Sequence, residues 1–191
     1  MTKKLALLAM TLAFVWAGCV VSSVYPYYTD KDVTFDAKLV GEWSQNNETK
    51  EFWKFTKDGD NRYAVQFTDS DKVTTDLEGR LFQLNGQRYL DLLGKDQKLS
   101  TIPVHALMKV MLTDSELTLT TINYDWMDEL LKKSPAALRH HRIRAGDGPD
   151  DYRLILTADS AELQSFVIKN QATEAAWTKS DPMKRRGNSG K

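Results

Sequence analysis

Cysteine is almost absent from this 191-residue chain, since the only one is Cys19. An intramolecular disulfide framework and a multi-cysteine zinc site are therefore excluded. An excess of charge of one sign is also lacking, because 26 lysines and arginines balance 26 aspartates and glutamates. A nucleic-acid-binding surface needs basic residues against the phosphates, so this balance argues against a nucleic-acid partner. No apolar run reaches the roughly 20 residues that a spanning helix needs.

Recognisable catalytic motifs are lacking as well. The chain has no Gly-x-Ser-x-Gly, Ser-x-x-Lys or P-loop pattern. Its histidines are His105, His140 and His141, and the adjacent pair would point to opposite faces of a strand, which prevents chelation of one metal. Paired carboxylates such as Asp69 and Asp71 fall in turns, where acids are normally solvated. We therefore expect no enzymatic activity, no catalytic residues, no cofactor and no metal site.

The first 18 residues have the pattern of a signal peptide. Lys3 and Lys4 form a positive start, and an uncharged run of twelve residues, Leu5 to Trp16, follows. This run has the length of the apolar region of a secretion signal and is too short for a permanent anchor. Two small residues and then Cys19 complete the segment. Without the two leader lysines the product has a net charge of −2.

The segment Trp16-Ala17-Gly18-Cys19 resembles the lipobox of bacterial lipoproteins, with Trp16 where that family usually has leucine. The resemblance implies cleavage before Cys19, a diacylglycerol on its sulfur and a fatty acid such as palmitate on its new amino group. Two or three acyl chains hold a protein to a bilayer, whereas one binds only marginally. In Gram-negative lipoproteins an aspartate directly after the cysteine tends to retain the protein in the inner membrane. The residue here is Val20, so the resemblance implies the outer membrane, facing the periplasm. The alternative is an ordinary secretion signal with a chance cysteine.

The rest of the chain divides into three parts. Residues 19–36 mix small and polar residues with tyrosines and Pro26, which predicts a lipidated tether. Its tyrosines would either touch the lipid headgroups or fold back onto the domain. Residues 37–181 have the apolar content of one globular domain. Residues 182–191 are basic and lack a core residue, which predicts a disordered tail.

Hydrophobic residues alternate with polar ones along most of the domain, as in Tyr63, Val65 and Phe67. Such alternation predicts strands with one dry and one wet face. Asp58-Gly59 and Asn85-Gly86 separate successive strands and suit tight hairpins. Helical spacing appears in 123–134, with Asp125 as its expected cap, and after Asp159; a last strand is expected at 175–179. We therefore predict a mainly β fold, an antiparallel up-and-down barrel with two short helices.

Gly41-Glu42-Trp43 is similar to the G-x-W motif of lipocalins and lipocalin-like bacterial lipoproteins. The resemblance implies that Trp43 closes one end of the barrel and that Gly41 permits a sharp turn. It covers about residues 38–180. The chain departs from lipocalins in lacking a Thr-Asp-Tyr motif and a clear late arginine partner for Trp43, and in its additional helix at 123–134.

The predicted inward face suggests a binding function. If the barrel is hollow, its lining suits a small apolar ligand; if the same side chains meet in the middle, the core is filled. A filled barrel would favour the alternative, a protein-interaction adaptor or assembly factor of an envelope complex, docking through the helix that bears Trp126, Leu130 and Leu131 or through the basic run 139–144. The predicted ligand-lining residues are Trp53, Phe55, Tyr63, Val65, Phe67, Leu77, Leu81, Met108, Val110, Leu117 and Leu119.

Overall fold

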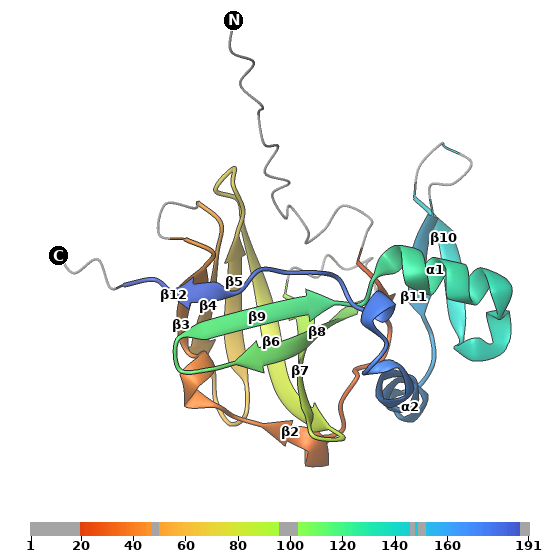
Figure 1. The fold of residues 1–191 in the computed structure, drawn as a ribbon, viewed down its shortest axis with the longest axis horizontal. Coiled ribbons are helices and arrows are strands. Elements are labelled where there is room, and N and C mark those ends of the chain that lie inside the picture. Colours follow the sequence, from red (N-terminus) through yellow and green to blue (C-terminus); the bar gives the residue numbers. More distant parts are fainter. Residues whose placement is uncertain (1–19, 47–49, 96–102, 146–147, 149–151, 188–191) are drawn as a thin grey trace, which may run out of the picture.

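A closed antiparallel barrel of eight strands forms the main body of the protein (Figure 1). The computed structural model describes residues 20–46, 50–95, 103–145, 148 and 152–187. Seven strands follow one another along the chain, which confirms the predicted antiparallel up-and-down barrel. The eighth strand, β12, lies between β3 and β9 and closes the barrel, which the sequence did not predict. The barrel strands are β3 (Gly41–Ser44), β4 (Phe52–Lys57), β5 (Tyr63–Thr68), β6 (Thr74–Leu84), β7 (Gln87–Gly94), β8 (His105–Leu112), β9 (Glu116–Thr121) and β12 (Met183–Arg185).

The predicted hairpin turns lie where the sequence placed them. Asn85 and Gly86 join β6 to β7 with φ angles of 45° and 79°. Positive φ at both central residues matches the twist of the flanking strands, which is why Asn-Gly suits this position. Gly59, between β4 and β5, has φ of 76°. These turns fix the register, so that Phe55 faces Val65 and Val65 faces Leu77 across neighbouring strands.

A second group of elements packs on the outside of the barrel, at the right of Figure 1. We call it the annex; it consists of β1 (Ser22–Ser23), α1 (Tyr124–Lys133), β10 (His140–Arg144), β11 (Tyr152–Leu156) and α2 (Ser160–Asn170). The first residues of β8 pair with β1, β1 runs parallel to β11, and β11 pairs with β10. Barrel strand β8 therefore joins the barrel sheet to the strands of the annex.

Short elements and helix caps complete the fold. Asn123, rather than the expected Asp125, caps α1 by accepting the N–H of Trp126, while Asp159 caps α2 as predicted. The expected strand at 175–179 is wrong: a 3-10 helix occupies Glu174–Ala176, and Trp177 makes only an isolated bridge to Ile122. The remaining elements are β2 (Val33–Thr34) and 3-10 helices at Asp30–Asp32, Ala37–Leu39 and Pro135–Ala137.

Two hydrophobic cores share the barrel wall. One fills the barrel and includes Trp43, Phe55 and Leu90. The other lies between the outer face of the barrel and the annex, where Phe82 and Tyr89 of the wall meet residues of both helices. Strand β7 is therefore buried on both faces from Tyr89 to Leu92, which departs from the expected pattern of one dry and one wet face.

Residues 20–36 of the predicted tether do not form a free linker but pack onto the domain, and the burial of Tyr27 agrees with the alternative that the tyrosines fold back. Val21 is 2% exposed and Tyr27 is fully buried. The N–H of Tyr27 donates to the Asp91 carboxylate at 2.9 Å, and His105 Nδ1 lies 2.6 Å from the other oxygen of that carboxylate. The segment packs because its apolar side chains contact the outer wall of the barrel and because the buried Asp91 carboxylate accepts a hydrogen bond from its backbone. Cys19 itself lies outside the described residues.

The predicted disordered tail at 182–191 is also wrong over residues 183–185. These form β12, which hydrogen-bonds on both sides, and Met183 is 8% exposed. Backbone pairing in a barrel does not need apolar side chains, so the basic composition did not reveal the strand. Residues 188–191 of the predicted tail lie outside the described part of the chain.

Trp43 does have a late arginine partner, contrary to expectation. The guanidinium of Arg185 lies 4.4 Å from the Trp43 ring centroid, which is cation–π geometry. The same group donates to the carbonyls of Val40, at 2.7 Å, and Lys38. Trp43 is fully buried, and its indole N–H donates to Leu39 O at 2.9 Å. Gly41 has a φ of 138°, and a Cβ at this position would clash with the Arg185 guanidinium.

Candidate functional site

The predicted inward residues do face the inside of the barrel. All eleven belong to one buried cluster, and none is more than 8% exposed. Aromatic rings fill the centre: the ring centroids of Trp53 and Phe67 are 4.7 Å apart, and Phe55 meets Tyr63 edge to face at 6.4 Å. The middle of the barrel is thus packed rather than hollow.

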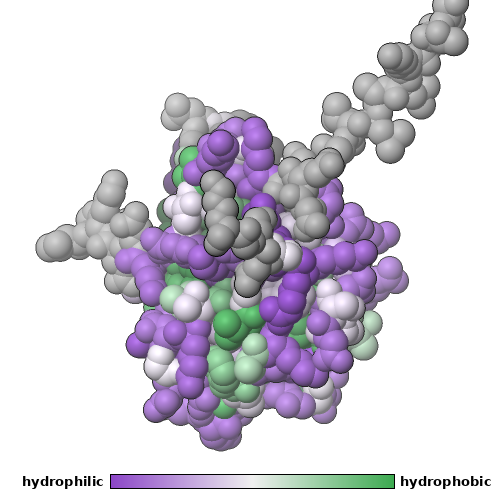
Figure 2. All heavy atoms as spheres, turned by 90° about the vertical axis from the view of Figure 1, so that its left-hand side faces the viewer, coloured by the Kyte–Doolittle hydropathy of each residue, from purple (hydrophilic) through white to green (hydrophobic). Residues whose placement is uncertain are grey.

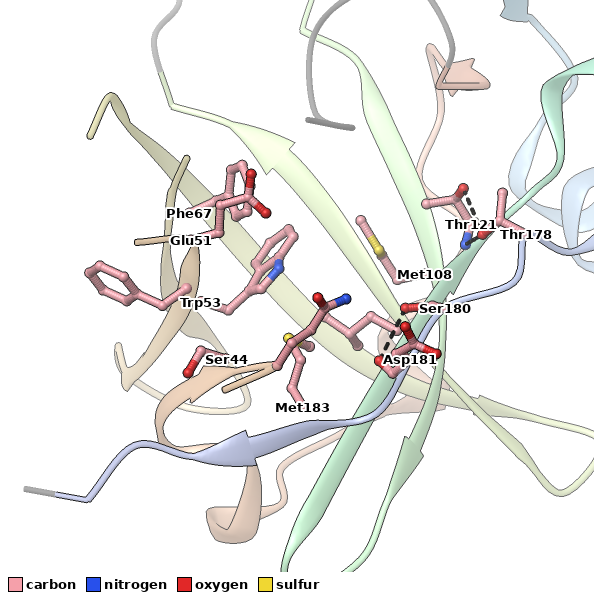
Figure 3. Close-up of a pocket in the computed structure, with 13 residues that line it drawn as sticks. Ser44, Glu51, Trp53, Phe67, Met108, Thr121, Thr178, Ser180, Asp181 and Met183 are labelled. Carbon is pink, nitrogen blue, oxygen red and sulfur yellow. Dashed lines mark hydrogen bonds between the residues drawn. The ribbon is translucent and has the colours of Figure 1, made fainter. Parts of the chain in front are cut away.

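A small cavity remains at one end of the barrel, where β3 ends and β4 begins (Figure 3). Four predicted residues line it: Trp53, Phe67, Met108 and Leu119. Its volume is about 70 Å³, and exposed Gln45 and Asp181 are part of its wall, so it reaches the surface. The other seven predicted residues pack in the core and do not line the cavity; they are Phe55, Tyr63, Val65, Leu77, Leu81, Val110 and Leu117.

Polar side chains that the alternating pattern did not indicate make up the other wall. In Figure 3, Ser180 and Asp181 lie opposite Trp53 and Phe67. Thr178, on the same segment, accepts the N–H of Thr121 through its hydroxyl at 3.0 Å, which ties that segment to β9. The lining residues beyond the four predicted ones are Ser44, Gln45, Glu51, Phe52, Thr121, Thr178, Ser180, Asp181 and Met183.

Glu51 carries the most unusual group in the cavity. Its Oε1 is buried, and no residue within the described ranges lies at hydrogen-bonding distance from it. Burial raises the pKa of the Glu51 carboxyl, the nearby Asp69 raises it further, and a hydrogen bond from the Ser70 N–H opposes the rise. An acceptor held beside Phe67 without a donor is available to a ligand that brings one.

The size of the cavity limits what it can hold. Pockets for drug-sized ligands measure about 300–1,000 Å³, so a cavity of about 70 Å³ admits a few heavy atoms and not a whole fatty-acyl chain. Figure 2 shows the face of the barrel that carries β3, β4 and β12, where a hydrophobic area is framed by hydrophilic residues. The site suits one small group with an apolar body.

Other polar clusters have structural explanations. Asp91 and His105 are joined by the 2.6 Å contact, but that pair is enclosed with the N-terminal segment and Asp91 is 1% exposed. His140 and His141 lie on β10, and Arg142 beside them pairs with Asp128 of α1. In the part of the chain that the structure describes, no three histidine, cysteine or acidic side chains are arranged to hold a metal ion.

The two surfaces predicted for docking both belong to the annex. On α1, Leu131 is 1% exposed, and Trp126 packs on Phe166 of α2 with ring centroids 6.1 Å apart. The basic run 139–144 begins with exposed Arg139 and continues as β10. An open groove of about 550 Å³ lies between the two helices, lined in its floor by Leu130, Leu138 and Phe166.

Comparisons of the chain with known protein families, with curated proteins and with solved structures found no match.

Proposed function

We propose that this protein is a lipid-anchored component of the bacterial cell envelope, held at the periplasmic face of the outer membrane through acylated Cys19, and that its barrel binds a small, mainly apolar group at the cavity described above. The observation that carries the binding role is that cavity, because its aromatic wall, its polar wall and the unpartnered Glu51 oxygen meet at one end of an otherwise filled barrel. The role is non-enzymatic.

The anchor rests on the lipobox resemblance at residues 16–19. Among the described helices, none has the length and apolar character to cross a bilayer, and an acylated cysteine supplies membrane attachment without one. Ser22 already pairs with Ile155 on one side and Ala106 on the other. Acyl chains on Cys19 would therefore hold the domain close against the bilayer, without a long flexible linker.

Extraction of bound small molecules tests the binding role. Residues 20–191 would be directed to the periplasm, purified without detergent and extracted with organic solvent for mass spectrometry. We expect one small molecule near stoichiometric amount. A Ser180→Phe variant, which places a ring in the cavity, should lose it. Lys179→Phe should retain it, because the exposed neighbour is not part of the lining. A protein that carries no extractable molecule would contradict the binding role.

The packed middle of the barrel and the groove between α1 and α2 favour a second candidate function, a protein-interaction adaptor. Its floor is apolar, and Arg139 at its rim pairs with Glu162 at 2.6 Å and Asp159 at 3.0 Å. The tagged full-length lipoprotein would then co-purify with one envelope protein. A Leu130→Arg substitution in the groove should abolish that capture, and Ser180→Phe in the cavity should leave it unchanged.

A further inference from the structure

Aromatic rings make the floor of the cavity. Trp53 and Phe67 lie with ring centroids 4.7 Å apart and planes tilted by 42°, and Phe52 lines the same space. The face of an aromatic ring carries partial negative charge and attracts a cation placed over it. The rim already holds one example, because the Arg186 guanidinium lies 4.6 Å from the Phe52 ring centroid without being part of the lining.

The charged residues of the lining all have the same sign. They are Glu51 and Asp181, and the thirteen lining residues include no lysine or arginine. Lys179 and Lys184 flank Asp181 in the sequence, but both are exposed and neither lines the cavity. Figure 3 shows the two carboxylates on opposite walls. A ligand between these walls is therefore within reach of two negative charges and of aromatic faces.

The buried oxygen of Glu51 distinguishes this arrangement from an ordinary acidic rim. Glu51 as a whole is only partly buried, but its Oε1 is buried and has no donor among the described residues, and a bound N–H group or cation would supply that donor. An anionic ligand would instead meet like charge at both walls.

We propose that this cavity selects a small organic cation, an alkylammonium group, over neutral and anionic groups of the same shape. This inference rests on the proposed binding function and names its ligand class. The volume of about 70 Å³ matches a compact ammonium head with a few carbon atoms. Trp53 and Phe67 contact its alkyl part, Glu51 accepts its N–H, and Asp181 faces it from the opposite wall.

Three probes of similar shape test the charge preference: tert-butylammonium, tert-butanol and trimethylacetate. Residues 20–191 contain every described element and four of the five tryptophans, so the indole N–H region of a ¹⁵N NMR spectrum should hold four signals. The Trp43 and Trp177 indoles are occupied by the carbonyls of Leu39 and Asn170. Binding in the cavity should move the Trp53 signal and leave the other three in place.

We expect tert-butylammonium to bind at least tenfold more tightly than tert-butanol at pH 7 and constant salt, and trimethylacetate to give no saturable shift. Glu51→Gln should weaken the cation about tenfold, the factor expected for loss of one charged partner. Glu116→Gln, at the start of β9, removes the same charge away from the cavity and should change nothing.

Each other result has a definite meaning. Equal or tighter binding of tert-butanol or trimethylacetate at Trp53 would overturn the cation preference and leave the binding function intact. An unchanged affinity in Glu51→Gln would show that Glu51 does not select the ligand and would also overturn it. If no probe moves the Trp53 signal, the inference fails, and the extraction experiment decides separately whether the proposed function fails with it.

Discussion

The N-terminal segment should contribute to the stability of the barrel through Asp91. This carboxylate is 1% exposed; it accepts the N–H of Tyr27 at 2.9 Å and contacts His105 Nδ1 at 2.6 Å. Each buried polar group that loses its partner costs about 1–3 kcal/mol. Asp91→Ala removes the acceptor from both groups, so we expect it to lower the free energy of unfolding by about 3–5 kcal/mol.

The asparagine variant refines this prediction. Asp91→Asn keeps an oxygen for the Tyr27 N–H and offers an amide donor to an unprotonated His105 Nδ1, so the loss should be only about 1 kcal/mol. Asp76→Ala is the control, since Asp76 is an exposed aspartate on the neighbouring strand β6. Its effect should stay within about 0.5 kcal/mol.

Urea unfolding of residues 20–191 at pH 7 measures these differences. With a slope of about 2 kcal/mol per molar urea, the midpoint should fall by about 2 M for Asp91→Ala and about 0.5 M for Asp91→Asn. Limited proteolysis should also cut the Asp91→Ala variant first within residues 20–36. If the alanine variant loses less than about 1 kcal/mol, or matches Asp76→Ala, then the segment does not stabilise the domain and the reasoning is refuted.

Three further predictions concern the barrel ends. Gly41→Ala should destabilise the fold by about 2 kcal/mol, because φ of 138° strains alanine and the new Cβ displaces Arg185 from Trp43; thermal unfolding of Gly41→Ala with and without Arg185→Met should show coupling, and simple additivity would contradict it. Because burial raises the pKa of Glu51, its ionised form is disfavoured in the folded state. Glu51→Gln should thus have a larger free energy of unfolding than the wild type at pH 7. This difference should shrink as the pH is lowered to about 4, because the Glu51 carboxyl is then protonated in the folded state; a difference that does not depend on pH would contradict this prediction. Ending the chain at residue 181 removes β12, leaves edges on β3 and β9 and should cause self-association, visible by size-exclusion chromatography; a monomeric, equally stable product would count against β12 as the closing strand.

The barrel could be predicted because its strands combine two local signals. Alternation places Tyr63, Val65 and Phe67 on one face, and Asn85-Gly86 supplies a turn with positive φ. The hydrophobic period and the turn residues therefore indicate the same strands. The annex interface did not follow from this pattern. On β7, Asp91 occupies an outward position that looks wet in the sequence, yet the packed N-terminal segment covers it.

Only the apolar wall of the cavity was predicted from the sequence. Trp53, Phe67, Met108 and Leu119 lie in alternating strands and therefore carried a signal. Its polar wall comes from a loop end and from the segment after α2, where the conformation is set by tertiary contacts such as that of Thr178 with Thr121. Single polar residues in such segments have no period, so Glu51 could not be distinguished from other surface acids.

The tail strand illustrates the same limit. β12 has one buried apolar side chain, Met183, and is held by backbone pairing and by Arg185 over Trp43. All of these partners, in β3 and β9, lie far from β12 in the chain. Composition alone indicated a solvated tail.

The attachment of lipid at Cys19 is the claim on which the location of the protein and the position of its domain at the membrane depend. The intact mass of the protein isolated from membranes of cells that produce the full chain tests it directly. We predict a polypeptide of residues 19–191 that carries a diacylglyceryl group and one amide-linked fatty acid, and an uncleaved, unacylated chain for Cys19→Ala. A wild-type product that begins at another residue, or that carries no fatty acid, would contradict the account.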